Sequence, residues 1–173
     1  SMFQHVLIML TIYIGGITFS GSLIAYGKLS EKLKLGKGSM ITNLFISFFY
    51  LSMPALIYVI GEPSISQFIP QVPSYFLIFL GITLIAGIGF VMPIGGGDMP
   101  VVISLLNSLS GIAAAFAGLL LLNNVLIVAG SLVGASGLIL TIIMAKAMNR
   151  TITNILFVGY ASSSQSASSE EQG

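Results

Sequence analysis

Long apolar runs, separated by short polar or glycine-rich breaks, dominate the pattern along the chain. Five runs come close to the ~20 residues that an α-helix needs to cross about 30 Å of hydrocarbon. They cover residues 6–27, 41–60, 75–94, 99–122 and 125–147. Lipid offers backbone groups no hydrogen-bond partners, and the runs lack the alternation of barrel strands, so we expect helices. The pattern predicts an all-α integral membrane protein, a bundle of five transmembrane helices.

Composition agrees with this prediction, and the charges add an orientation. Of the 173 residues, 55% are hydrophobic and only 6% are charged, which is far from the balance of a soluble domain. All six basic residues lie either between the first and second runs or at the end of the fifth: Lys28, Lys32, Lys34, Lys37, Lys146 and Arg150. If the runs alternate in direction, both groups lie on one side of the membrane. The positive-inside rule then places the N-terminus outside and the C-terminus on the cytosolic or matrix side.

The end of the chain differs in composition from the rest. Residues 1–160 form the predicted transmembrane domain, whereas residues 161–173 are rich in Ser. We interpret this last segment as a disordered linker toward a further domain that the sequence lacks. The chain has no cysteine and a single histidine, His5. No thiol site, catalytic triad or metal-ligand cluster can therefore be assembled from its residues.

One amide, Asn107, lies in the middle of the fourth run. An unsatisfied amide in hydrocarbon costs several kcal/mol, so its presence asks for an explanation. Ser104 and Ser108 lie within one helical turn of it and extend the polar character of the helix. This polar set suits either hydrogen bonding between helices or a file of water, and the residues alone favour neither.

One carboxylate, Asp98, precedes the fourth run and follows Gly95, Gly96 and Gly97. Asp98 suits the N-cap of the helix that follows, where its side chain would accept from the first free amides. A cap alone does not need three glycines, which suggest a mobile hinge at the aqueous boundary. Both interpretations stay open. The glycines do not form a phosphate-binding loop, because neither a preceding strand nor a Walker lysine is present.

Small residues recur at helical spacing in the fifth run. Gly130, Gly134 and Gly137 share one face and predict close packing against another helix. The pair Asn123 and Asn124 predicts a tight turn, so the fourth and fifth runs should form an antiparallel hairpin.

A similar stripe of small and hydroxyl residues lies in the first run, at Thr11, Gly15, Thr18 and Ser22. We interpret it as a packing surface. Its hydroxyls either bond back to their own helix or line a pore.

Four segments of the chain resemble one protein family. Residues 15–28, 95–111, 132–137 and 144–150 are similar to the membrane domain of proton-translocating NAD(P) transhydrogenase, in its beta-subunit part or the equivalent part of a single-chain form. The resemblance covers nearly all the chain up to about Tyr160. It implies an enzyme that couples hydride exchange between NADH and NADP+ to proton movement across a bacterial inner or mitochondrial inner membrane.

The same resemblance implies cofactors and partners. The complete enzyme would use NADP(H) and NAD(H), bound by soluble domains outside this chain, so the fragment would bind neither and transfer no hydride alone. Its partners would be those domains, the remaining transmembrane helices, membrane lipid and a second copy of the complete enzyme.

The resemblance also assigns roles to individual residues. Asn107 matches a polar residue of the family's proton pathway, with Ser104 and Ser108 beside it. Contact with the NADP(H)-binding domain is implied for Asp98 and its glycines, and for a second group: Lys146, Asn149 and Arg150. The family's membrane histidine belongs to an earlier helix that this chain lacks, and His5 does not match it.

Two other functions remain possible from the residues alone. The chain could be a small transporter or channel subunit whose pathway follows the Asn107 face, although no internal repeat supports this. It could also be a structural membrane scaffold, in which Asn107 serves folding only.

Overall fold

The computed structural model of the chain describes residues 2–32 and 73–156. These residues form α1 (Met2–Leu29), α4 (Pro73–Val91), the short 3₁₀ helix η1 (Gly96–Asp98), α5 (Met99–Leu121), α6 (Asn124–Ala147) and α7 (Ile152–Leu156). No strand occurs among them, so the predicted all-helical class is confirmed for this part of the chain. The predicted run 41–60 and the predicted linker 161–173 lie outside the described residues.

Three of the described helices are long and apolar enough to cross a membrane. They cover Phe3–Leu29, Gly96–Leu121 and Asn124–Ala147, and they correspond to the first, fourth and fifth predicted runs. The third run corresponds to α4, in which the apolar stretch Phe79–Val91 is shorter. The membrane character is therefore confirmed, while the count of five spans and the orientation stay predictions.

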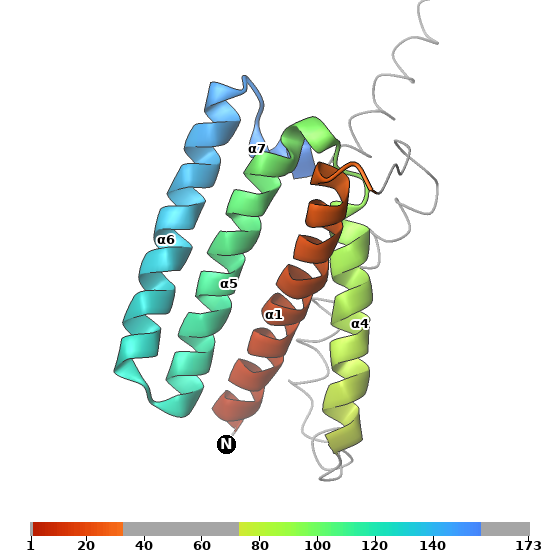
Figure 1. The fold of residues 1–173 in the computed structure, drawn as a ribbon. Helices are drawn as coiled ribbons and strands as arrows, with labels where there is room; N and C mark the ends of the chain where they lie inside the picture. The colour runs from red at the N-terminus through yellow and green to blue at the C-terminus, as the bar shows by residue number, and fades with distance from the viewer. Residues whose placement is uncertain (1, 33–72, 157–173) are drawn as a thin grey trace, which may run out of the picture.

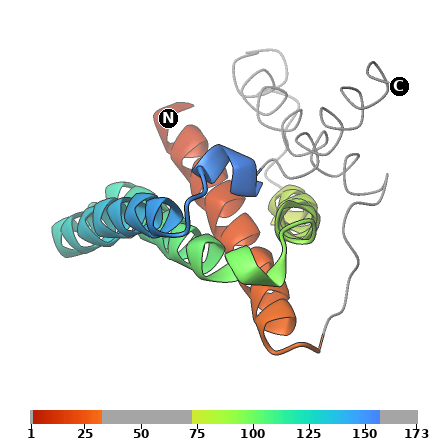
Figure 2. The same cartoon turned by 90° about the horizontal axis from the view of Figure 1, so that it is seen from above.

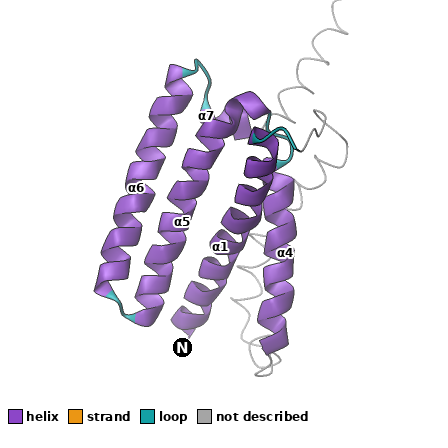
Figure 3. Ribbon diagram, viewed as in Figure 1, coloured by secondary structure: helices purple, strands orange, loops and turns teal. Residues whose placement is uncertain are grey.

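The four long helices lie side by side in the order α6, α5, α1, α4 (Figure 1). Helices α1, α4 and α6 run in one direction and α5 runs in the opposite direction, as Figure 1 also shows. The end of the bundle that holds Lys28, Asp98, Lys146 and Arg150 is called the basic end below. Seen from above, α6 and α4 lie on opposite sides of the bundle (Figure 2). The loops that join α4 to η1, α5 to α6 and α6 to α7 are short (Figure 3).

The turn between α5 and α6 is the predicted Asn123–Asn124 hairpin. Leu122 adopts a left-handed conformation with φ 54° and ends α5. The Asn123 N–H donates to the Gly118 carbonyl at 2.9 Å, and the Asn123 side chain accepts from the Leu126 N–H at 3.1 Å. Asn123 thus bonds back to the last turn of α5 and caps the first turn of α6.

Glycines bring the α5 and α6 backbones together. A Cβ atom added to Gly111 would lie 2.5 Å from the Gly134 nitrogen, and one added to Gly130 would lie 2.5 Å from the Ala115 nitrogen. At Gly137 the added atom would lie 3.0 Å from the Ser108 Cα. Such contacts exclude any side chain at these positions, because the partner atoms belong to backbone that cannot move aside alone.

A second close pairing joins α1 and α4. A Cβ atom added to Gly16 would lie 2.1 Å from Thr83 Oγ1, and one added to Gly87 would lie 2.6 Å from the Ile17 carbonyl oxygen and 1.9 Å from Ser20 Oγ. This pairing was not predicted from the sequence, because single Gly, Ser and Thr residues are common on membrane helices.

The basic end of the bundle has its own apolar core. Ala25 of α1, Val91 of α4, Met99 of α5, Ala145 of α6 and Ile155 of α7 are all buried in one cluster. Helix α7 was not predicted from the sequence, and it places Ile155 fully out of solvent in this cluster. The described α-helices therefore all contribute to one apolar cluster at the basic end.

Candidate functional site

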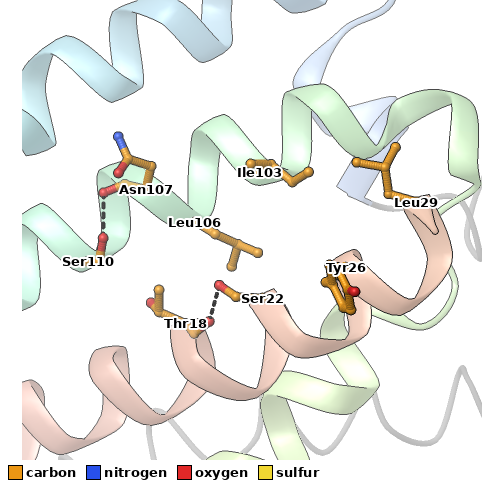
Figure 4. Close-up of a pocket in the computed structure, with 8 residues that line it drawn as sticks. All are labelled: Thr18, Ser22, Tyr26, Leu29, Ile103, Leu106, Asn107 and Ser110. Atoms are coloured by element: carbon orange, nitrogen blue, oxygen red, sulfur yellow. Dashed lines mark hydrogen bonds between the residues drawn. The ribbon is translucent and has the colours of Figure 1, made fainter.

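A groove of about 370 Å³ lies between α1 and α5 (Figure 4). Its lining combines two polar stripes with apolar residues: Thr18, Ser22, Tyr26, Leu29, Ile103, Leu106, Asn107 and Ser110. The first-run stripe that the sequence pointed out and the Asn107 position thus meet across one seam.

Hydroxyl groups in the groove bond to their own helices. Thr18 Oγ1 donates to the Ile14 carbonyl at 2.7 Å, and Ser22 Oγ donates to the Thr18 carbonyl at 2.6 Å. Ser110 Oγ donates to the Asn107 carbonyl at 2.8 Å (Figure 4). Each hydroxyl donates its hydrogen to a backbone carbonyl. Only its oxygen lone pairs are therefore left to accept a hydrogen bond from a molecule in the groove.

The Asn107 side chain is exposed on the α5 side of this groove. Among the described residues its amide has no hydrogen-bond partner, although its backbone carbonyl accepts from Ser110. Asn107 follows Met99 by eight positions, which places it about 12 Å along α5 at ~1.5 Å per residue. An amide at that depth needs water or another polar group to satisfy it.

Ser104 and Ser108 lie on a different side of α5, against α6. Ser108 Oγ donates to the Gly134 carbonyl at 2.6 Å, and Ser104 Oγ donates to the Gly137 carbonyl at 3.3 Å. Both serines are buried. The structure therefore does not bring them together with Asn107, since the polar positions of α5 divide between two faces.

Asp98 and Arg150 form an ion pair at the basic end. The two distances from Arg150 Nη1 to the carboxylate oxygens of Asp98 are 2.8 and 3.1 Å. The Asp98 side chain is 8% exposed, whereas that of Arg150 is 44% exposed. Asp98 occupies the N-cap position of α5, but its side chain makes no capping hydrogen bond. The capping interpretation is therefore wrong for the side chain, which accepts hydrogen bonds from Arg150 instead.

The end of α6 aims Arg150 at this carboxylate. Asn149 adopts a left-handed conformation with φ 55°. Its N–H donates to the Lys146 carbonyl and the Arg150 N–H donates to the Ala145 carbonyl, both at 3.0 Å. These two bonds form a Schellman motif, which turns the chain back over the helix end. Asn suits this position because it tolerates the left-handed region better than most residues.

The residue after the motif starts the next helix. The Asn154 N–H donates to Thr151 Oγ1 at 3.3 Å, which caps the first turn of α7. Arg150 is thus held between two structured elements, whereas Lys146 is exposed in the last turn of α6.

No steric feature of this conformation requires glycine at residues 95 to 97. A Cβ atom added to Gly95, Gly96 or Gly97 would meet no atom within 4 Å, and none of the three has a positive φ. Glycine here supplies backbone freedom or room for a partner rather than relief from a clash.

The fold and the site define a class of protein: an integral membrane protein with a polar groove between two helices and, at one end, an ion pair with a buried carboxylate. Comparison with protein families narrows this class. The family model for the NAD(P) transhydrogenase beta subunit matches residues 1–173. The chain belongs to the NAD(P) transhydrogenase beta subunit family, which confirms the resemblance inferred from the sequence.

Two curated relatives, both named NAD(P) transhydrogenase subunit beta and both from Rhodospirillum rubrum, are similar to the chain. Each is 42% identical to it over 151 residues, which is 86% of this chain and 31% of the relative. The chain therefore spans about a third of the length of these curated relatives. The family assignment favours a part of an enzyme over the small transporter or channel subunit.

Proposed function

We propose that the chain supplies part of the membrane domain of a transhydrogenase, in which hydride exchange between NADH and NADP+ is coupled to proton movement. The observation that carries this proposal is that one helix, α5, bears both required elements. Asp98, at the N-cap position of α5, pairs with Arg150 through a buried carboxylate, and the middle of α5 lines the groove at Asn107.

In this proposal the groove between α1 and α5 is the chain's share of the proton path. An amide cannot carry a proton near neutral pH, so Asn107 acts by orienting water or a neighbouring titrating group. The lone pairs of Thr18, Ser22 and Ser110 continue the polar surface on both sides of it. Ser104 and Ser108, which face α6, hold the hairpin together instead of touching the path.

The coupling element is the segment from Gly95 to Asp98. A nucleotide-binding domain that contacts the basic end differently in its two states would bias this segment, because a ligand shifts an equilibrium only through differential contacts. Lys146, Asn149 and Arg150 belong to the same contact surface. Arg150 alone among them holds the buried carboxylate, so the Asp98–Arg150 pair is the contact most sensitive to such a bias.

The complete enzyme would bind NADP(H) and NAD(H) on soluble domains outside this chain and would act as a homodimer in its membrane. Residues 161–173 would link the membrane domain to the NADP(H)-binding domain. The fragment by itself would bind no nucleotide, so every functional test needs the full protein.

The test is the replacement Asn107→Leu in the complete enzyme, reconstituted in vesicles. Hydride exchange is measured with and without an imposed proton gradient, together with proton uptake per hydride. We expect the proton-coupled rate to fall while uncoupled exchange persists, and Asn107→Gln to retain partial coupling. Ile103→Leu, which changes an apolar residue of the same groove, serves as the control. Unchanged coupling in Asn107→Leu would remove this residue from the mechanism.

A further inference from the structure

Lys28, at the end of α1, contacts no carboxylate in the described part of the chain. Its ammonium group donates to two backbone carbonyls across the bundle, those of Met92 and Ile94, the latter at 2.8 Å. These carbonyls belong to the turn that follows α4 and precedes Gly95. The side chain is half-buried, so the contact is more than a lysine extended into solvent.

The helix directions explain why a cation belongs there. Helices α1 and α4 run in parallel, so both carboxyl ends lie at the basic end (Figure 1). Each helix end carries unsatisfied carbonyls and a partial negative charge of about half an electron. One ammonium between them offsets both and ties α1 to the turn after α4.

This contact fixes one end of the glycine segment, and the ion pair fixes the other. Lys28 holds the chain at Ile94, and Arg150 holds it at Asp98. Between them lie only Gly95, Gly96 and Gly97, none of which needs to be glycine in the conformation observed. The backbone freedom of the glycines is therefore bounded by two cationic contacts that come from distant parts of the sequence.

We propose that Lys28 is a positioning residue for coupling: it pins the end of α4, so that movement of Asp98 is confined to the three glycines. The proposal rests on the proposed function, because it assumes that the Asp98 segment transmits the state of a nucleotide domain. Without the pin, the turn from Met92 to Ile94 would move with the glycines. A bias applied at Asp98 would then be absorbed in the turn instead of reaching α5.

Thiol labelling tests directly whether the contact of Lys28 with the turn after α4 restrains the glycine segment. This chain has no cysteine, and Gly96 accepts a Cβ without a clash, so Gly96→Cys introduces a reporter at the segment itself, measured above the labelling of the enzyme without it. In the complete enzyme, we expect Lys28→Met to raise the labelling rate of this thiol about tenfold, the effect of losing one charged hydrogen bond. Lys28→Arg, which keeps a donor cation, should stay near the parent rate. Lys32→Met is the matched control, since Lys32 lies over the Tyr26 ring at 6.0 Å and not on these carbonyls.

Coupling is measured on the same variants without the reporter. We expect Lys28→Met to lower proton uptake per hydride while uncoupled exchange stays at the parent rate, and Lys28→Arg to rescue it. If Lys28→Met does not accumulate in the membrane, Lys28→Gln, which can still donate to one carbonyl, should show both effects at reduced size. Equal labelling rates in Lys28→Met and Lys32→Met would overturn the proposal and leave Lys28 a topological anchor. Faster labelling with intact coupling would instead contradict the role of the Asp98 segment in the proposed function.

Discussion

The Asp98–Arg150 pair gives a prediction whose size can be worked from the structure. Both carboxylate oxygens lie within 3.1 Å of one guanidinium nitrogen, and the carboxylate is almost fully buried. Breaking a fully buried pair costs about 3–5 kcal/mol. Arg150, however, is 44% exposed, and solvent screening reduces the value of such a pair. We therefore expect Arg150→Met to lower the free energy of unfolding by about 2 kcal/mol.

A double-mutant cycle separates the pair from other effects of each change. Asp98→Asn removes the charge and keeps the shape, so the double variant Asp98→Asn with Arg150→Met leaves no buried carboxylate unpaired. The pairwise energy should be about 1–2 kcal/mol, within the range of contacting residues. The assay is unfolding by SDS in mixed micelles, with Lys146→Met as the control for loss of a nearby exposed cation. A pairwise energy below about 0.3 kcal/mol, the usual error of additivity, would refute the reasoning.

Three further predictions follow from the packing. Asn149→Ala should cost about 1 kcal/mol in the same unfolding assay, because alanine resists the left-handed region, whereas Asn149→Gly should be neutral. Gly111→Ala should cost about 1–3 kcal/mol because the added Cβ meets the α6 backbone, while Gly81→Ala, with open space around it, should cost nothing. A bis-maleimide bridge between Thr18→Cys and Ser110→Cys, which joins the two sides of the groove, should lower proton-coupled hydride exchange relative to the same variant without the bridge.

Much of the fold could be predicted from hydrophobic pattern alone. A membrane helix is specified by its length and apolarity, which are local properties, so the runs of α1, α5 and α6 were found. The hairpin was found because Asn123 and Asn124 leave no other path between two helices. Helix α7 was missed because five residues, Ile152–Leu156, carry no periodic signal, and Ile155 is buried in an apolar cluster to which residues distant in the sequence contribute.

The site was predictable only in part, for a physical reason. Residue types indicated Asn107 and Asp98, since an amide and a carboxylate are costly in lipid wherever they point. The residues that each of them contacts depend on how α5 is rotated about its axis and on segments distant in the sequence. Residue type alone specifies neither. The contact of Asp98 with Arg150 and that of Lys28 with Ile94 join positions 52 and 66 residues apart. Helical spacing grouped Ser104 and Ser108 with Asn107, but it could not tell which side of α5 would face α6, where the two serines lie.

The closest backbone approaches join the described helices in two pairs, although α1 also packs along α5. Gly16 and Gly87, together with Lys28, lock α1 to α4, and Gly111 and Gly134 lock α5 to α6. The seam between the two pairs is where the groove lies, and it is closed at the basic end by the shared apolar core. If each pair moves as a body, the proposed displacement of Asp98 would turn the α5–α6 hairpin against α1 about that core. Asn107 lies on the helix that directly follows Asp98, and the width of the groove beside Asn107 is the quantity that such a rotation would change.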